Sequence, residues 1–541
     1  MERMKRRIAL MLAAASMLVM LSSCALIDTA KSNIDEIAAR FRQDNTEDQT
    51  AAEQPAQAQS RTAPNSVTVG VVGIDTWNPL LSQSPTVREA MEFVYDTLYE
   101  VNENHEAVPV LAKDFAVSPD GLTVSVGLKS DVIWHDGRKF DAYDVVYTSN
   151  LIMGGGTVYG DLLKDVRECK MRGTDTAVFS LYRSVPDFVS LLTYPIVQYK
   201  TDMSYTASIE PVGTGPFSFH GKIGTDRYML IAADSYHNGR ASINGVYIVD
   251  VPDQDKHKRL FEVGEIDIMT DASVDIVNGM PRGYANLNLY TSDRMTYLGF
   301  NTASAPVAGA ATRRGISKLI DREEIIESVL YSKAKPVRIP INPDSYLYYD
   351  TKSSFKATYE EAYADFEEDG WEGKEYGFQR NSQSGVQGLA AHLLVNSDNA
   401  VMMQTANRVK TSLDHFGVAV DIDAQPYDAY VWKINAHDFD MFIGEADLGN
   451  NGDLTPLTGE WNYFSYSNPS MNTLIAQAGM TTDTEQMKQL YIQMGQLIEH
   501  DMPFAPLYFL DGCVLSGSRV KTGIAPTVSS YYRVANLWKI N

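Results

Sequence analysis

Three short motifs in the 541-residue sequence carry the residue types of serine-based acyl-transfer chemistry. Ser353 and Lys356 form a Ser-x-x-Lys pattern, Ser397 opens a Ser-Asp-Asn pattern, and Lys521 opens a Lys-Thr-Gly pattern. In such an arrangement Ser353 would attack a carbonyl carbon as the nucleophile, and Lys356 would accept its proton as the base. The three motifs therefore raise the hypothesis of a serine hydrolase.

The surroundings of these motifs argue against that hypothesis. Their order is that of the penicillin-recognising serine hydrolases, whose nucleophile lies at a buried, apolar helix. Ser353 is instead followed by the acidic stretch 359–369, which predicts a solvated helix face. Asn399 is placed to cap a helix, and the Lys-Thr-Gly motif is not followed by Ser or Thr. We therefore keep the hydrolase only as an alternative, and we expect no catalytic residues and no enzymatic activity.

Cysteine and histidine residues do not form a metal-binding pattern. Apart from Cys24, the chain has only Cys169 and Cys513, and its nine histidines show no His-x-x-x-His spacing. A structural zinc site needs clustered thiolates or imidazoles. We therefore expect no metal and no cofactor. Cys169 and Cys513 are expected to be buried free thiols, although a disulfide between them stays open because sequence does not show proximity.

The charge balance and the hydropathy exclude two classes of protein. There are 46 Lys and Arg residues against 69 Asp and Glu residues, which gives a net charge of -23. A nucleic-acid partner is not expected, because binding it requires clustered positive charge. A helical membrane bundle needs several apolar runs of about 20 residues, and the only long apolar run is at the N-terminus.

The N-terminal residues predict export and lipid attachment. Residues 1–7 are rich in basic side chains, residues 8–21 are apolar apart from Ser16, and small residues precede Cys24. This order is typical of a secretory signal. Its Leu-Ser-Ser-Cys ending resembles a bacterial lipobox, which implies a signal peptide at residues 1–23, lipidation of Cys24 and a location on the extracytoplasmic face of the cell membrane. The polar residues 24–66 predict a lipid anchor and a flexible tether.

Hydrophobic periodicity predicts an α/β chain after the tether. Residues 67–72 predict a strand, and residues 86–99 predict an amphipathic helix. Asn399 and Gly417 are expected to cap the two ends of one helix, and a capping box that opens at Thr482 predicts the start of another. Strands and helices mix without a fixed repeat, which is typical of an α/β or α+β architecture with several lobes.

Six motifs together resemble the family 5 extracellular solute-binding proteins of bacterial ABC importers, which include binders of oligopeptides, dipeptides and nickel. The motifs occur in the order of that family at residues 134–146 (WHDGRKFDAYDVV), 211–217 (PVGTGPF), 264–267 (GEID), 300–322, 466–475 and 501–508. Each motif is weak alone, but the six together cover the chain from residue 67 onward. The turn and cap chemistry of Gly137, Asp144 and Gly213 indicates that these motifs serve the scaffold.

The resemblance implies a bilobal periplasmic-binding-protein-like fold of type II, the large class with an extra subdomain, whose two lobes close over a central ligand cleft. Lobe I is expected to be discontinuous, over residues 67–105, 215–300 and 510–541. An inserted subdomain is expected over residues 106–214, and lobe II over residues 301–509. Closure of such lobes excludes water from the ligand.

The resemblance also implies where a ligand binds. In the peptide-binding members, an Asp after a strand that ends in Gly pairs with the free amine of the peptide, and here Asp447 follows Gly444. A carboxylate and an ammonium group form a charge-assisted hydrogen bond that orients the ligand. The peptide binders of the family usually have Gly-Trp where this chain has Gly444-Glu445, and Ala446 follows as a further candidate site residue. The usual aromatic wall is therefore in doubt, and Glu445 is a candidate contact for a cationic ligand.

Five further positions match ligand-binding positions of the family. Tyr427 falls where oligopeptide binders have a pocket aromatic, and Tyr159 falls where one has a tyrosine near the ligand amine. Gln83, Ser84 and Pro85 correspond to a stretch that pairs with the peptide backbone as a β-strand does. We expect these residues to contribute to the ligand site.

Together these inferences predict a monomeric, lipid-anchored receptor. It would capture a short peptide and deliver it to an ABC permease and ATPase complex. Two other ligands remain open, a nickel chelate and another small cationic solute, although no histidine cluster marks a nickel site. A lipid-anchored sensor with the same fold and no role in transport is also compatible with the sequence.

Overall fold

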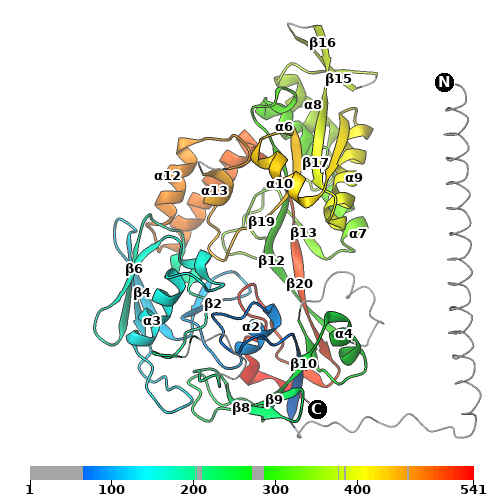
Figure 1. Ribbon diagram of the computed structural model, residues 1–541. Coiled ribbons are helices and arrows are strands. Elements are labelled where there is room, and N and C mark those ends of the chain that lie inside the picture. Colours follow the sequence, from blue (N-terminus) through cyan, green and yellow to red (C-terminus); the bar gives the residue numbers. More distant parts are fainter. Residues whose placement is uncertain are drawn as a thin grey trace, which may run out of the picture. The chain divides into compact units, whose positions relative to one another are not determined.

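The computed structural model describes residues 65–201, 203, 210–270, 285–375, 377–382, 385–459 and 462–540. The predicted signal peptide, the tether and the predicted lipidation site Cys24 lie outside the described residues. In the described part, strands and helices mix along the chain, as the sequence indicates (Figure 1).

A large mixed sheet organises the fold. Its strands, in hydrogen-bonded order, are β18 (Ala419–Gln425), β17 (Ala390–Asn396), β19 (Met441–Asp447), β12 (Ala285–Phe300), β20 (Phe504–Gly517), β11 (Ile268–Met269), β1 (Ser66–Val72), β10 (Gly245–Val251), β9 (Arg227–Ala232) and β8 (Phe217–Ile223), with β13 (Ala334–Pro336) beside β20. The strand predicted at residues 67–72 is β1, which runs parallel to β10 and β11. Its side chains are buried on both faces, as is usual for parallel strands.

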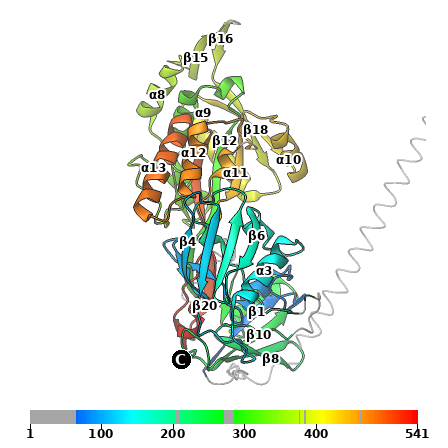
Figure 2. The same ribbon diagram turned by 90° about the vertical axis from the view of Figure 1, so that its left-hand side faces the viewer.

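The long antiparallel strands β12 and β20 run between the two groups of elements seen in Figures 1 and 2, and they contribute to hydrophobic cores in both. At one end, Phe300 and Leu507 pack in a core that also contains Ile316. At the other end, Leu515 packs in a core with Val251. We call the part that contains β1 and β8–β11 lobe I, and the part that contains β17–β19 lobe II.

The pairing of β12 with β20 is interrupted between the lobes. Thr291 is opposite Asp511 and Met295 is opposite Phe509, so residues 292–294 face a single residue of β20. Such a bulge bends a strand and changes the direction of its side chains. Because Met295 already packs in a core of lobe II, we now propose that β12 crosses between the lobes at this bulge and not at residue 300. The other predicted domain boundaries stay predictions.

Lobe I carries three smaller antiparallel sheets and the first helices. The sheets pair β4 (Ala112–Val117), β5 (Thr123–Leu128), β7 (Thr176–Leu181) and β6 (Val166–Met171) in that order, β2 (Tyr99–Val101) with β3 (Ala107–Pro109), and β21 (Val520–Thr522) with β22 (Lys539–Ile540). The helical segments are α2 (Pro85–Met91), α3 (Ala142–Met153), α4 (Gln254–Glu262), η1 (Gly160–Leu163), η2 (Phe188–Leu191) and η4 (Ala535–Leu537). Helix α3 packs on β6 and β7.

Lobe II carries the remaining helices and a small sheet. The helices are η3 (Ala305–Val307), α6 (Ala310–Lys318), α7 (Arg322–Val329), α8 (Tyr359–Glu368), α9 (Ala400–His415), α10 (Tyr427–Asn435), α11 (Thr455–Thr458), α12 (Pro469–Ala478) and α13 (Thr484–Asp501). The small sheet contains β14 (Glu372–Lys374), β15 (Gly377–Ser382) and β16 (Gly385–Gly388). Among the helices that the structure describes, none combines the length and the apolar character that a membrane span requires.

Buried polar groups in the predicted motifs hold the scaffold together. The guanidinium of Arg322 is buried and donates to the backbone carbonyls of Ser317, Val337 and Pro506, which joins α6, β20 and the segment after β13. Asp144 accepts from the indole N–H of Trp134 and completes a capping box at the start of α3. These motif residues therefore serve the fold, as predicted.

One helix cap differs from its prediction. The side chain of Asn399 accepts from the backbone N–H of Met402, and Gly417 follows α9 with φ +83°, so both predicted caps of this helix are confirmed. The capping box predicted at Thr482 is wrong. Asp483, one residue later, caps α13 by accepting from the N–H of Gln486, and its carboxylate is also favoured at the positive end of the helix dipole.

The helix predicted over residues 86–99 is α2, which ends at Met91. Beyond it the carbonyl of Val94 accepts from the N–H of Gly215 over 2.9 Å, so the chain leaves the helical pattern to pair with a distant segment. A Cβ atom on Gly213 would lie 1.7 Å from the same carbonyl oxygen. The glycines of residues 211–217 are therefore required by close backbone packing, and not by the turn chemistry that the sequence suggests for Gly213.

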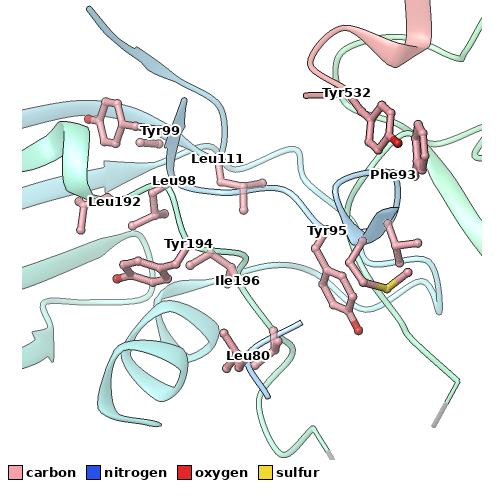
Figure 3. Close-up of a cluster of buried hydrophobic side chains, with 14 of the residues drawn as sticks. Leu80, Phe93, Tyr95, Leu98, Tyr99, Leu111, Leu192, Tyr194, Ile196 and Tyr532 are labelled. Atoms are coloured by element: carbon pink, nitrogen blue, oxygen red, sulfur yellow. The ribbon is translucent and has the colours of Figure 1, made fainter. Parts of the chain in front are cut away.

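Residues from both ends of the described chain share the core of lobe I (Figure 3). Phe93, just after α2, stacks on Tyr532 with ring centroids 4.4 Å apart. Stacked aromatic pairs add stability beyond the area that they bury. Cys169 lies in this core and Cys513 in another, and both are buried free thiols, as predicted.

Candidate functional site

The predicted ligand anchor Asp447 is the last residue of β19. The first part of this strand, Met441 to Ile443, is buried in lobe II. Its neighbour β12 runs antiparallel, with Arg294 opposite Asp447. On its other side, β17 pairs with β19 at Met441 and Phe442, so the carboxyl end of β19 extends beyond the β17 pairing that the structure describes.

A pocket of about 440 Å³ opens at this end of β19, beside α10. Four of the nine predicted site residues line it, namely Gly444, Glu445, Asp447 and Tyr427. The fifth residue from this region, Ala446, is partly buried and packs against a hydrophobic core of lobe II. Tertiary structure thus brings α10 and β19 together as the resemblance implies, while the ligand role of these residues stays a prediction.

Arg294 contacts the predicted anchor directly. Its Nε donates to Oδ1 of Asp447 over 3.3 Å, and the side chains are 53% and 69% exposed. An ion pair this exposed contributes at most about 1 kcal/mol to stability, so the contact does not hold the fold together. Sequence inspection misses Arg294 because 153 residues separate it from Asp447. The only signal is the polar run of residues 292–294, which interrupts an otherwise strand-like segment.

Glu445 adds a second carboxylate to the same pocket. Partial burial raises its pKa, the charge of Arg294 opposes that rise, and the charge of Asp447 adds to it. When both acids are ionised, two negative charges face one guanidinium. The pocket lining therefore has an unbalanced negative charge that a cationic group of a ligand would neutralise.

Tyrosines form the aromatic part of this pocket. Tyr427 and Tyr463 are both exposed and line it. Tyr430 lies beneath them and donates its hydroxyl to the carbonyl of Ile443 over 2.7 Å. A Cβ atom on Gly444 would lie 2.6 Å from the ring of Tyr297, so glycine is required there by close packing. These rings provide an aromatic surface although the usual Trp after Gly444 is absent.

The remaining predicted residues lie in lobe I. Pro85 and Tyr159 line a second pocket of about 320 Å³, together with Asn450 from lobe II. Gln83 and Ser84 line neither pocket. The hydroxyl of Ser84 donates to the carbonyl of Val72 over 2.7 Å, and the N–H of Gln83 donates to a carboxylate oxygen of Asp75 over 2.7 Å. The two residues therefore stabilise the loop before α2, and the nine predicted residues are divided between two pockets and this loop.

Four acids line the lobe I pocket and none of them was predicted: Glu89, Glu92, Asp96 and Glu100. Burial raises the pKa of Glu92 to about 8, although the hydroxyl of Ser530 and the N–H of Tyr532 donate to its carboxylate. Burial also raises the pKa of Glu100 to about 7. An acid within the apolar run of residues 86–99 is the signal that could have identified Glu92. These carboxyl groups make the lobe I pocket sensitive to pH near neutrality.

The three motifs of the hydrolase hypothesis serve other purposes. Nζ of Lys356 lies 3.6 Å from Oε2 of Glu323. Asn399 caps α9, and Lys521 lies in β21 of lobe I. None of these residues lines either pocket.

The groups in the lobe II pocket are suited to binding an ionic ligand. Tyrosines, two carboxylates and one guanidinium can hold such a ligand through charge-assisted hydrogen bonds. Among the described residues, no group of three or more His, Cys, Asp or Glu side chains could hold a metal ion. The arrangement therefore fits non-covalent capture of a charged organic solute.

A protein-family comparison identifies the class. The family described as "Bacterial extracellular solute-binding proteins, family 5 Middle" matches residues 106–470. The chain therefore belongs to the family 5 bacterial extracellular solute-binding proteins, and the resemblance stated from its motifs is confirmed. Members of this family act as binding proteins.

Individual relatives cover most of the chain at low identity. The oligopeptide-binding protein AppA of Bacillus subtilis is 24% identical and covers 82% of this chain and 85% of its own. Heme-binding protein A of Haemophilus influenzae is 22% identical, and the match covers 82% of this chain and 86% of that protein. The solved structure of a nickel ABC transporter from Bacillus halodurans has a TM-score of 0.74 at 20% identity. The match covers 88% of this chain and 99% of that chain. The structural likeness confirms the bilobal α/β fold, and the names show that ligands differ among relatives.

Proposed function

We propose that this protein is the substrate-binding lipoprotein of an ABC importer, which captures a short peptide and delivers it to a membrane permease. Family membership supports the receptor role. Relatives named as oligopeptide-binding and dipeptide-binding proteins support the peptide. The N-terminal signal and Cys24 support a lipid anchor on the extracytoplasmic face of the membrane.

The observation that carries this proposal is the excess of carboxylate at the end of β19. Among the residues that the structure describes, Asp447 and Glu445 line the pocket together with one guanidinium, that of Arg294. An ammonium group at the N-terminus of a peptide neutralises this excess and donates hydrogen bonds to Asp447. The exposed tyrosine rings offer apolar surface to the adjacent side chain of the peptide.

A thermal-shift screen of the purified protein tests the proposal. Pools of di- to pentapeptides, free amines and nickel–histidine are each added at increasing concentration. A ligand that binds only the folded state stabilises it by RT ln(1 + [L]/Kd), which is about 2.7 kcal/mol at a concentration 100 times Kd. Peptide pools should raise the unfolding temperature, and the absence of a shift with every pool would contradict the proposed ligand.

The same charge excess favours a second candidate ligand, a small cationic solute without a peptide bond. Such a solute needs only the two carboxylates and an aromatic face. In the screen, stabilisation by free amines without stabilisation by peptides would select this candidate. Stabilisation by nickel–histidine alone would select a metal chelate, which requires few ligands from the protein itself.

A further inference from the structure

A third pocket, of about 400 Å³, lies where the two lobes meet, and we call it the Asp187 pocket. Lobe I contributes residues of β3, β4 and η2, and lobe II contributes Tyr346 and the connection from α12 to α13. Figure 2 shows β4 beneath α13 at this junction. None of its lining residues lines the lobe I pocket or the lobe II pocket. The Asp187 pocket is therefore separate from the pockets that contain predicted ligand residues.

Direct contacts between the lobes hold the walls of this pocket together. The N–H of Tyr346 donates to the carbonyl of Asn104 over 2.8 Å, and the hydroxyl of Ser184 donates to the carbonyl of Ala476 over 3.1 Å. A Cβ atom on Gly479 would lie 2.7 Å from the carbonyl carbon of Ser184, so the two backbones pack closely. A molecule that contacts both walls would stabilise this arrangement of the lobes.

Most of the lining of the Asp187 pocket is apolar. Two of its hydrophobic side chains remain open to solvent, with Val108 39% exposed and Phe115 40% exposed. Further apolar walls come from Val117, Val124, Phe188, Val189 and Met487. Exposed apolar side chains that gather in a concave surface mark a binding site, and both this volume and this composition are typical of pockets for small molecules.

The charge of the lining is negative. Asp187 is half-buried, and burial raises its pKa to about 7, while a hydrogen bond from Ser190 opposes that rise. The other acids of the lining, Glu106 and Asp483, are exposed, and within the described part of the chain no Lys, Arg or His lines the pocket. A partly buried carboxylate among apolar side chains is stabilised when a cation binds beside it.

We infer that the Asp187 pocket is a second ligand site, which binds a hydrophobic primary amine whose ammonium group pairs with Asp187 while its apolar group packs against Phe115 and Val108. The ammonium group donates a charge-assisted hydrogen bond to the carboxylate, and the apolar group removes the exposed ring of Phe115 from water. A neutral analogue keeps only the apolar contact, and an anionic analogue is repelled by the acids of the lining.

Calorimetry with the full-length protein tests this inference. Phenethylamine, phenethyl alcohol and phenylacetate share one ring and differ in charge, and they are compared at about pH 8, where Asp187 is mostly ionised and a primary amine is still protonated. The amine should bind about tenfold or more tightly than the alcohol, and phenylacetate should bind least tightly. Because the lobe II pocket also has an unbalanced negative charge, the comparison is repeated in Asp447→Asn, which should keep the preference for the amine.

Two variants separate the charged contact from the apolar contact. Asp187→Asn removes the charge, and Asn tolerates the left-handed backbone at this position, where φ is +40°. In this variant the amine and the alcohol should bind within about twofold of each other. Phe115→Ala should weaken binding of both probes about fivefold and keep the preference for the amine. The matched control Asp131→Asn, at an exposed acid of lobe I, should behave as the unsubstituted protein does.

Three results would overturn the inference. One is a tenfold preference for the amine that survives in Asp187→Asn. Another is binding of the amine that is lost in Asp447→Asn and unchanged in Asp187→Asn and Phe115→Ala, because the amine would then occupy the lobe II pocket. The third is equal binding of the three probes, or no binding of the amine. None of these results bears on the proposed peptide ligand, since no probe contains a peptide bond.

Discussion

Arg183 of lobe I and Asp453 of lobe II are 270 residues apart in sequence, and Nη2 of Arg183 lies 2.5 Å from Oδ2 of Asp453. The same guanidinium contacts Asp165 of lobe I through two nitrogens. Asp453 lies six residues after Asp447, the proposed anchor of the ligand. The end of β19 therefore carries the proposed ligand contact, and the short segment that follows it carries an ion pair between the lobes.

Replacing Arg183 with Met should destabilise the protein. Asp453 is 9% exposed and Arg183 is 32% exposed, so the substitution leaves a nearly buried carboxylate without its partner. We expect a loss of about 1–3 kcal/mol in the free energy of unfolding, less than for a fully buried pair because solvent reaches Arg183. Urea unfolding measures this loss in the free energy of unfolding. Arg240→Met, which breaks an exposed pair with Asp234, is the control and should cost less than about 0.5 kcal/mol. Equal losses in both variants would contradict the role of the ion pair between the lobes.

Asp447→Asn should weaken binding of amine-containing ligands. The substitution keeps the size of the side chain and removes the charge that an ammonium group requires, so affinity should fall about tenfold or more. N-acetylated peptides, which lack the ammonium group, should bind the variant and the unsubstituted protein alike. Calorimetry with matched free and acetylated peptides measures both effects. Asp421→Asn, at an exposed acid of β18, serves as the control, and an equal loss for both kinds of peptide would argue against Asp447 as the amine anchor.

Gly213→Ala should be strongly destabilising. The new Cβ atom would overlap the carbonyl oxygen of Val94, and relief requires movement of the backbone beside α2. We expect a loss of about 3 kcal/mol or more in the free energy of unfolding. Gly388→Ala is a matched control because a Cβ atom there meets nothing within 4 Å. A similar, small effect of both substitutions in thermal unfolding would show that the segment is not packed this closely.

Protonation of His257 should destabilise the fold at acidic pH. Burial lowers its pKa to about 4, and within the described part of the chain neither ring nitrogen has a hydrogen-bond partner. The unfolded chain takes up this proton near pH 6.5 and the folded chain only near pH 4, so stability falls as pH decreases through this window. The contribution reaches about 3 kcal/mol at pH 4.

The variant His257→Leu isolates that contribution. Its unfolding free energy, measured by urea denaturation, should depend less on pH between about 6.5 and 4 than that of the unsubstituted protein. His392→Leu, at an exposed histidine, should keep the original pH dependence. If the two variants have the same pH profile, the buried ring of His257 is not the group that titrates.

Cys24→Ser should release the protein from the membrane. The substitution removes the only atom of the predicted lipobox that can carry a thioether-linked lipid. Fractionation of expressing bacteria and incorporation of radiolabelled palmitate measure the effect. Cys169→Ser, at a buried thiol, should leave attachment unchanged. Membrane attachment that persists in Cys24→Ser would contradict the predicted lipid anchor.

Local sequence signals predict much of the scaffold. Asn399 and Gly417 cap α9 as expected, because a cap depends on the backbone geometry of a few neighbouring residues. The strand β1 follows from its run of valines. The capping box at Thr482 was predicted wrongly, because Asp483 competes for the same N–H groups with a stronger acceptor.

The sequence by itself determined the α/β class, the family, the caps of α9 and the acidic residues at the end of β19, since each depends on residue types at short or fixed spacing. Only the tertiary structure decided that Arg294 lies beside Asp447, that α2 ends at Met91, and that Arg183 joins the lobes. Each of these features depends on a contact between segments more than 100 residues apart in sequence. Such segments meet only when whole strands and lobes pack together. The charge of the ligand pocket therefore follows from where the β12 bulge meets β19.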